Sequence, residues 1–330
     1  MKKKVLVTGA TGFTGGYLAE ELVNQKYSVR ALSLPKQNTE KLEKMGVEIV
    51  YGDLTKKDTL AAAVEGVDTI YHIAAIFREQ NVPKQLFYDV NVGGTKNLLE
   101  SAVEANVRRF VHCSTVGVQG EIENPPATEE APYNPGDVYQ DSKVEGEKLA
   151  LQFFKENTDK IEGVVFRPVG IYGPGDMRFL KIFKFVNSGK FRMIGNGEVK
   201  YHLTYVTDLA KGIALCGQKK EAVGEVFTLG GNEYVTLNEY VKLLAEALEV
   251  PVPKKRVPLA PMMAAAVLCE ALCYPLRIQP PIYRRRLDFF TKDRAFDISK
   301  AKKLLGYNPS EDLKTGLKKT AEWYKKENLL

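Results

Sequence analysis

The stretch KVLVTGATGFTGG, residues 4–16, decides the fold. It begins as the apolar run of a buried strand and leads into helical spacing over residues 14–25. Between the two, Gly9, Gly12 and Gly15 have the spacing G-x-x-G-x-x-G. Glycines at such a turn let the backbone approach a pyrophosphate, and the helix N-terminus offers free amides and a positive dipole. The stretch predicts a dinucleotide-binding turn, for which a flexible turn is the alternative.

Strand-like and helix-like stretches alternate outward from this turn. The expected strands are 4–9, 28–33, 46–53, 68–74, 108–115, 162–168 and 225–231. The expected helices are 14–25, 57–65, 90–105, 207–217, 234–248 and 297–306. This order implies right-handed parallel crossovers. We expect the α/β fold class, with a Rossmann-type doubly wound parallel sheet and a smaller interleaved α+β substrate-binding region.

The domain boundaries follow from the same alternation. We expect residues 1–168 to form the NAD(P)-binding domain, with 200–231 returning to it. Residues 169–199 and 232–330 would form the substrate-binding region. The chain of 330 residues exceeds the size at which a single core usually stops growing, which agrees with two unequal parts.

The second expected strand ends without the acid that usually bonds the ribose 2′-hydroxyl. No Asp or Glu occurs between Glu21 and Glu40, and Ser33 takes the expected place, with Lys36 nearby. Without a carboxylate to repel a 2′-phosphate, the cofactor is NAD or NADP, with the preference undecided. Asp53, after the third strand, is placed to bond the adenine or, equally, to act as a helix cap or turn residue.

The pentapeptide YQDSK, residues 139–143, holds a tyrosine and a lysine four residues apart. On a helix these two side chains share one face. An ordinary surface pair is the plain interpretation. The alternative is a tyrosine tuned for proton transfer, because a nearby ammonium favours the phenolate of a group that titrates near pH ~10.

With these pieces, the chain resembles the extended short-chain dehydrogenase/reductase superfamily, in its NAD-dependent epimerase/dehydratase group. The stretches that carry the resemblance are TGATGFTGG (8–16), GDL (52–54), HIAA (72–75), NVGGTKNLL (91–99), CST (113–115), YQDSK (139–143) and RPVGIYGPGD (167–176). The resemblance implies an enzyme whose catalytic set is Thr115, Tyr139 and Lys143, with Ser114 as a less favoured stand-in for Thr115.

The resemblance also implies which residues bind the cofactor. These positions are Gly9, Thr11, Gly12, Phe13, Gly15, Ser33, Lys36, Asp53, Leu54, Ala74, Ala75, Asn91, Lys143 and Pro168. For Asn91, a helix-capping role is the alternative. Members of the superfamily often dimerise through helices that include the tyrosine-bearing one, so a homodimer is expected by resemblance.

Departures from the family pattern narrow the reaction. Sugar dehydratases and nucleotide-sugar decarboxylases of the superfamily place an acid after the catalytic threonine, whereas Val116, Gly117 and Val118 follow it here. Sugar-nucleotide enzymes often have an asparagine in place of Gly170 and an arginine in place of Tyr201. The expected substrate-contacting residues are Ser114, Val116, Gly170, Tyr201, His202 and Arg284.

The C-terminal half resembles the 3β-hydroxysteroid and sterol-4-carboxylate dehydrogenase branch. The stretches concerned are IYGPGDMRFL, GNGEVKYHLTYVTDLAKGI, QPPIYRRR, FDISKAKKLLGYNP and the apolar segment 257–276. We therefore expect hydride transfer at a secondary alcohol or ketone of a bulky, lipophilic substrate. The alternatives are a nucleotide-sugar epimerase, with Arg284, Arg285, Arg286 or Arg294 binding the diphosphate, and a non-catalytic cofactor-binding sensor or assembly subunit.

Bulk composition excludes several other classes of function. The net charge of +6 is mild and spread along the chain, so no nucleic-acid partner is expected. The four cysteines and three histidines lack metal-ligand spacing, so we expect no metal. The N-terminal residues show no targeting signal, and a reduced cytoplasmic setting is expected. Segment 257–276 is interpreted as a core helix or the wall of an apolar pocket, and weak contact with a membrane surface is its secondary interpretation.

Overall fold

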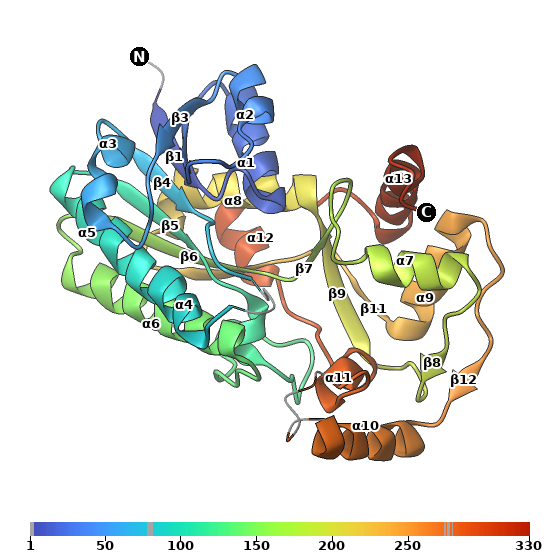
Figure 1. Ribbon diagram of the computed structural model, residues 1–330. Helices are drawn as coiled ribbons and strands as arrows, with labels where there is room; N and C mark the ends of the chain where they lie inside the picture. The colour runs from blue at the N-terminus through green and yellow to red at the C-terminus, as the bar shows by residue number, and fades with distance from the viewer. Residues whose placement is uncertain (1–2, 78–81, 274, 276–277, 279) are drawn as a thin grey trace.

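The computed structural model describes residues 3–77, 82–273, 275, 278 and 280–330. Its larger part is a seven-stranded parallel sheet in the order β10-β6-β5-β4-β1-β2-β3 (Figure 1). These strands are β1 (Lys4–Thr8), β2 (Ser28–Ser33), β3 (Glu48–Tyr51), β4 (Thr69–His72), β5 (Arg109–Cys113), β6 (Glu162–Pro168) and β10 (Val226–Leu229). All seven strands predicted from the sequence, and the doubly wound α/β fold, are confirmed.

Helices cover both faces of this sheet (Figure 1). One face packs against α1 (Phe13–Asn24), α2 (Glu40–Lys44), α8 (Val206–Gln218) and α12 (Ser299–Leu305). The other face packs against α3 (Ala61–Val64), α5 (Thr95–Glu104) and α6 (Val138–Glu156). Apolar strand residues pack against both helix layers, as is usual for parallel strands, although no residue of the edge strand β3 is fully buried.

The strand order reverses beside β1, which pairs with β2 on one side and with β4 on the other. Ligands of doubly wound folds bind at the carboxyl ends of the strands at such a switch point. The turn of residues 9–12 lies there, between β1 and α1. The fold therefore puts the predicted dinucleotide-binding turn at the position where its function requires it.

The smaller part is built around a three-stranded sheet in the order β11-β9-β7. Its strands are β7 (Gly170–Tyr172), β9 (Lys200–Tyr205) and β11 (Tyr234–Thr236), and a short pair joins β8 (Met193–Ile194) to β12 (Arg256–Val257). A separate apolar core holds α7 (Leu180–Asn187), α9 (Leu237–Leu248) and α13 (Leu313–Lys326) against this sheet. The sequence predicted that the chain returns to the larger part at residue 200. In the structure, β9 pairs with β7 and β11 of the smaller sheet, so the return begins with the next element, α8.

Some predicted helices differ from the structure at their beginnings. The helix predicted over 90–105 starts as a π-helical turn, Asp89–Gly94, that follows the short α4 (Lys84–Tyr88). The stretch 57–65 is divided between a 3₁₀ turn, Lys57–Thr59, and α3. Other 3₁₀ turns lie at Val116–Gln119 and Lys220–Ala222. The helix predicted over 234–248 starts at Leu237, because the residues before it pair with β9 as β11.

The apolar segment 257–276 forms α10 (Leu259–Cys273), and residues 274 and 276 lie outside the described residues. Its interpretation as a core helix is wrong, since only Ala266 and Glu270 of α10 are buried. The helix packs against α11 (Arg284–Thr291) and lies at the edge of the molecule in Figure 1. Because apolar residues surround the helix, its sequence does not indicate which side will be covered. In the structure only the narrow stripe with Ala266 and Glu270 is buried.

Candidate active site

The glycine turn has no room for larger residues. Gly9 has a φ of +72°, and a Cβ there would lie 2.8 Å from the amide nitrogen of Ala74. A Cβ on Gly15 would lie 2.1 Å from the Gly9 carbonyl oxygen. Phe13 begins α1, whose N-cap residue, Gly12, makes no side-chain cap bond. The N-terminal amides of α1 are therefore available to an anion, and the turn fits the diphosphate of a dinucleotide.

The end of β2 forms a polar cluster around one amide oxygen. Oε1 of Gln37 accepts from Oγ1 of Thr11 at 3.2 Å, from Oγ of Ser33 at 3.0 Å and from the backbone N–H of Leu34 at 3.2 Å. Lys36 is exposed in a left-handed conformation, with a φ of +78°. Thus Thr11, Ser33 and Lys36 lie at the same end of the sheet as the glycine turn. Gln37 was not predicted, and no sequence signal distinguishes it.

The loop after β3 holds Asp53 and Leu54. Oδ1 of Asp53 accepts from the N–H of Thr55 at 2.9 Å and from its hydroxyl at 2.8 Å, which is the arrangement of a turn residue. Leu54 is buried and packs closely on Gly94: a Cβ added to Gly94 would lie 2.8 Å from the Cβ of Leu54. Asp53 therefore has a turn-forming role in the structure, while its contact with adenine stays a prediction.

A chain of hydrogen bonds runs behind the glycine turn. Thr95 donates to the Asn91 carbonyl oxygen at 2.8 Å, so its Oγ1 receives the proton on Nε2 of His72 at 3.0 Å. Nδ1 of His72 then accepts from the Thr8 hydroxyl at 2.8 Å. The same hydroxyl accepts from the N–H of Ala74 at 3.2 Å. These bonds fix the end of β4 against β1 and α5, and Ala75 follows directly in the chain.

The Asn91 side chain extends these bonds to the tyrosine-bearing helix. Its Oδ1 accepts from the N–H of Ile76 at 2.9 Å, and its Nδ2 donates to Oγ of Ser142 at 2.9 Å. Ser142 donates in turn to the backbone carbonyl of Tyr139 at 2.8 Å. Asn91 is thus placed between the loop after β4 and α6. The helix-capping alternative for Asn91 does not apply, because it lies inside a π-helical turn.

The three predicted catalytic residues lie at the junction of β5 and α6. Nζ of Lys143 donates to the carbonyl oxygen of Cys113, the last residue of β5, at 2.5 Å. Thr115 follows two residues later, and its Oγ1 accepts from the N–H of Gly117 at 3.1 Å. Tyr139 lies one turn before Lys143 on α6. The fold therefore brings Thr115, separated from the other two by more than twenty residues, to the beginning of the same helix.

Burial controls the charge of this region. Lys143 is 3% exposed, and burial lowers the pKa of its ammonium, which the nearby Cys113 and Glu147 oppose. The two neighbouring histidines are fully buried. Burial lowers the pKa of His72 to about 3 and that of His112 well below its usual value, and the charge of Lys143 acts in the same direction. Lys143 is therefore the cation of this part of the core, and both imidazoles are neutral at physiological pH.

An aromatic and cationic cluster that the sequence did not reveal lies between the glycine turn and Tyr139. The Phe77 ring contacts the Tyr139 ring edge to face, with centroids 4.9 Å apart. The Arg178 guanidinium lies 5.9 Å from the Phe77 ring centroid and 5.4 Å from that of Phe13. Nε of Arg178 donates to Oδ1 of Asp176 at 2.6 Å, which fixes the position of the guanidinium. These residues are far apart in the chain, and no local pattern joins them.

The predicted substrate residues lie in several places. Ser114 is buried, and Val116 begins the turn after Thr115. Pro168, predicted for the cofactor, ends β6, and Gly170 begins β7 two residues later. Whether these residues contact a ligand stays a prediction.

The remaining predicted substrate residues belong to the smaller part. The Tyr201 hydroxyl donates to the Phe289 carbonyl oxygen at 2.9 Å, and the ring is in the core of the smaller part. Nε2 of His202 is 2.8 Å from the Gly231 carbonyl oxygen. Arg284 begins α11 and pairs with Glu270 of α10 at 2.7 Å. Each of these side chains thus has a structural contact, and any role with substrate stays a prediction.

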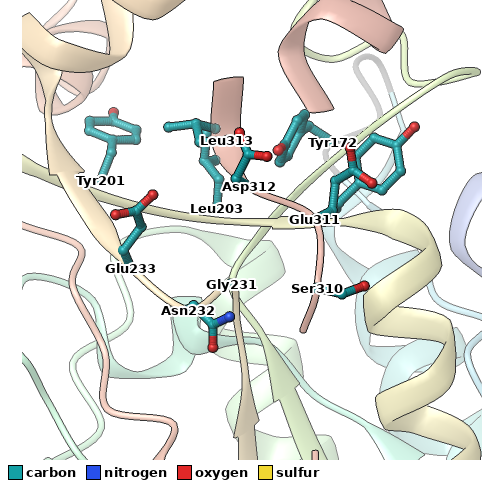
Figure 2. A pocket seen from close by; sticks show the side chains of 11 residues that line it. Tyr172, Tyr201, Leu203, Gly231, Asn232, Glu233, Ser310, Glu311, Asp312 and Leu313 are labelled. Atoms are coloured by element: carbon teal, nitrogen blue, oxygen red, sulfur yellow. The ribbon is translucent and has the colours of Figure 1, made fainter. Parts of the chain in front are cut away.

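A small cavity of about 100 Å³ lies in the smaller part, apart from the predicted catalytic residues. Figure 2 shows Tyr201, Tyr172 and Leu203 along it, with Glu233 from the loop before β11 and Asp312 at the start of α13. Ligand pockets are usually about 300–1,000 Å³. The cavity is therefore too small to be the site of a bulky substrate.

The described part of the chain lacks two features. Within it, no group of three His, Cys, Asp or Glu side chains is arranged to hold a metal ion. Nor does any helix within it combine the length and apolar character needed to cross a bilayer.

Comparisons with known proteins identify the family. The model of the NAD dependent epimerase/dehydratase family matches residues 5–230. A 3beta-hydroxysteroid-dehydrogenase/decarboxylase of Arabidopsis thaliana is 31% identical, covering 96% of this chain and 78% of its own. A 3 beta-hydroxysteroid dehydrogenase/Delta 5-->4-isomerase of Mycobacterium tuberculosis is 30% identical, covering 93% of this chain and 86% of its own.

A solved structure supports the same assignment. The UDP-glucuronic acid 4-epimerase of Bacillus cereus, in complex with NAD, superposes with a TM-score of 0.77 at 25% identity, over 98% of this chain and 99% of the other. The two relatives named here are thus 3beta-hydroxysteroid dehydrogenases, and the structural neighbour is a nucleotide-sugar epimerase. The chain belongs to the NAD-dependent epimerase/dehydratase family of extended short-chain dehydrogenases/reductases.

Proposed function

We propose that the protein is an NAD(P)-dependent dehydrogenase that interconverts a secondary alcohol and a ketone on a bulky, sterol-like substrate. The observation that carries the proposal is the position of buried Lys143, one turn after Tyr139 and bonded to the strand end that leads into Thr115. The sterol-type relatives at about 30% identity support the substrate class. The sequence after Thr115 provides no acid to protonate a leaving hydroxyl, which argues against dehydration as the reaction.

Each of the three residues has a definite task in this reaction. The Tyr139 phenolate accepts the proton of the substrate hydroxyl, and the resulting phenol returns it in the reverse direction. The Lys143 ammonium favours the phenolate, and Thr115 positions the reacting oxygen through a hydrogen bond. The nicotinamide supplies or accepts the hydride when the cofactor is bound. The glycine turn and the N-terminus of α1 hold the diphosphate.

We further propose that NADP is accepted as well as NAD. Ser33 ends β2 where an acid would repel a 2′-phosphate, and the Lys36 ammonium is exposed three residues later. The hydroxyl groups of Thr11 and Ser33 can also donate hydrogen bonds to a phosphate, and in the structure both donate to Oε1 of Gln37. Titration with NAD⁺ and NADP⁺ tests this directly: we expect NADP⁺ to bind at least as tightly, and binding of NAD⁺ alone would contradict the proposal.

The catalytic proposal is tested with Tyr139→Phe. We expect kcat for oxidation of a 3β-hydroxysterol to fall by about 10²–10⁴-fold, because general acid–base catalysis contributes about that much. The dissociation constant of the cofactor should change little. Tyr234→Phe, at a residue of β11 that is 37% exposed, is the matched control and should behave like the wild type.

The similarity to the Bacillus cereus epimerase supports a second candidate function, nucleotide-sugar epimerisation. Measuring the net formation of reduced cofactor distinguishes the two candidate functions. A dehydrogenase forms reduced cofactor in proportion to product, whereas an epimerase returns the hydride and forms none. Conversion of a UDP-sugar without net reduction, abolished by Tyr139→Phe, would establish the epimerase. A Tyr139→Phe protein that matches the wild type in every assay would instead indicate a cofactor-binding sensor.

A further inference from the structure

The outer face of α10 is aliphatic and uncharged. Val267 is 47% exposed, and Leu268 and Leu272 are each 61% exposed. Ala264, Ala265 and Ala271 are exposed beside them. Figure 1 shows α10 on the side of α11 that faces away from the seven-stranded sheet. A continuous apolar stripe at the edge of a protein marks an interaction surface.

The single acid of α10 faces away from this stripe. Glu270 is 7% exposed, and its carboxylate accepts from the backbone N–H of Arg284 at 2.9 Å and from Nε of the same residue at 2.7 Å. Ala266, one turn earlier, is the other buried residue of α10. The helix therefore has an inner stripe that attaches it to α11 and an outer stripe without a carboxylate.

Exposed cations lie on both sides of α10 in the chain. Lys254 and Lys255 precede it, and Arg286 follows it at the start of α11. None of these three cations has a carboxylate within ion-pair distance in the described part of the chain. The apolar stripe is thus flanked by positive charge on both sides, and its partner should combine an apolar interior with an anionic surface.

We propose that α10 docks on an anionic lipid bilayer, with its aliphatic stripe among the upper acyl chains and the flanking cations at the headgroups. A helix needs about 20 apolar residues to span a bilayer, and α10 has 15. Its length is therefore roughly 22 Å, which is shorter than the hydrocarbon core of about 30 Å. The helix therefore lies in the plane of the interface. Charge complementarity favours lipid over a second copy of this chain, because pairing of two α10 helices would bring like-charged ends together.

The attachment of α10 leads to the proposed catalytic helix. Arg285, next to the residue that binds Glu270, pairs with Asp137, and Asp137 caps the N-terminus of α6 two residues before Tyr139. A lipophilic substrate dissolved in the bilayer would be delivered beside this connection. That delivery rests on the proposed function, whereas docking of α10 does not.

Vesicle co-sedimentation without cofactor or substrate tests the docking. We expect the wild type to bind vesicles of phosphatidylcholine with phosphatidylserine, and to bind pure phosphatidylcholine and high-salt samples more weakly. Leu268→Ser with Leu272→Ser should weaken binding at least about tenfold, since each leucine side chain loses its apolar burial. Lys254→Gln with Lys255→Gln should weaken binding to the anionic vesicles and remove most of the salt dependence.

Val223→Ser, at a 39% exposed residue near the larger sheet, is the matched control and should bind like the wild type. Unchanged melting temperature and cofactor binding of the leucine variant show that it is folded. Equal binding by the leucine variant and the wild type would overturn the proposal. So would a wild type that ignores anionic vesicles but forms dimers that the leucine variant does not, which would assign the stripe to a second copy. Because no turnover is measured, loss of docking and failure of the proposed reaction are distinguishable.

Discussion

Lys143 has two histidines as close neighbours inside the protein. The His72 and His112 rings are 5.6 Å apart. His112 precedes Cys113 on β5, His72 ends the adjacent β4, and the Cys113 carbonyl oxygen accepts a hydrogen bond from Lys143. His72 is fully hydrogen-bonded, whereas neither ring nitrogen of His112 has a partner among the described residues. Protonation of either ring would bring two cations together without solvent. The protein therefore keeps both imidazoles neutral and the charge on Lys143.

This arrangement predicts sensitivity to acid. The pKa of His112 is lowered on folding, so the unfolded chain binds a proton below pH ~6.5 that the folded protein does not. Stability is therefore complete above that pH and is lost as pH falls, by about 1.4 kcal/mol per pH unit for each such histidine. His112→Leu should flatten this slope in urea unfolding between pH ~6 and 4. Equal slopes for the two proteins would contradict the neutral assignment, and above pH ~7 the slopes should agree in any case.

Single residues differ in how far local sequence reveals them. Thr115, Tyr139 and Lys143 were named from the resemblance to the family, and the structure places them at the junction of β5 and α6, while their catalytic roles stay a prediction. Arg178 and Gln37 could not be predicted, because their positions depend on contacts with residues of other loops. A guanidinium above Phe13 arises only when the chain folds the loop after β7 onto α1.

At the scale of elements, α6 is joined to the sheet by a buried ion pair. Glu147, fully buried, accepts from Nη2 of Arg167 at 2.5 Å and from its Nε at 3.1 Å. The Tyr133 hydroxyl donates to the same carboxylate at 2.7 Å. Burial, supported by the charge of Glu147, raises the pKa of Tyr133 to about 12, so this hydroxyl stays a donor. These bonds hold the helix that carries Tyr139 and Lys143 against β6.

Glu147→Gln should therefore be strongly destabilising. Removing one partner leaves the Arg167 guanidinium buried without its counter-charge, which costs about 3–5 kcal/mol. Denaturant unfolding measures the loss. Glu145→Gln, at an exposed position of the same helix, is the matched control and should change the free energy of unfolding by less than about 0.5 kcal/mol. A loss for Glu147→Gln no larger than that of the control would show that the ion pair does not stabilise α6.

The elements that the sequence predicted well are those with a strong period or a long apolar run. The seven parallel strands belong to this class, because helix layers on both faces favour a short apolar run in the strand, such as VLV in β1 and VVF in β6. The beginning of the helix after β11 was not predicted correctly. Tyr234–Thr236 form a strand because they pair with Lys200–His202, which lie far away in the sequence. The exposed position of α10 was also beyond prediction, because its apolar residues surround the helix and do not indicate an inner side.

At the scale of the whole molecule, the two parts are joined at several places rather than by one linker. Asp208, in the first turn of α8, accepts from the backbone N–H groups of Ser310 and Glu311, each at 2.7 Å, just before α13. Tyr17 of α1 donates to the Pro174 carbonyl oxygen at 2.9 Å. α12 packs on the larger sheet although it lies between elements of the smaller part in the chain. These contacts predict that the two parts unfold together.

The only tryptophan of the chain, Trp323, makes this testable, because it lies in α13 and packs against the core of the smaller part. The proposed cofactor site is in the larger part. Cofactor at about 100 times its Kd should raise the free energy of unfolding by about 2.7 kcal/mol. If the two parts unfold as one, Trp323 fluorescence and far-ultraviolet circular dichroism will show coincident transitions, and cofactor will shift both equally. A fluorescence transition that cofactor leaves in place while circular dichroism moves would show that the smaller part unfolds on its own.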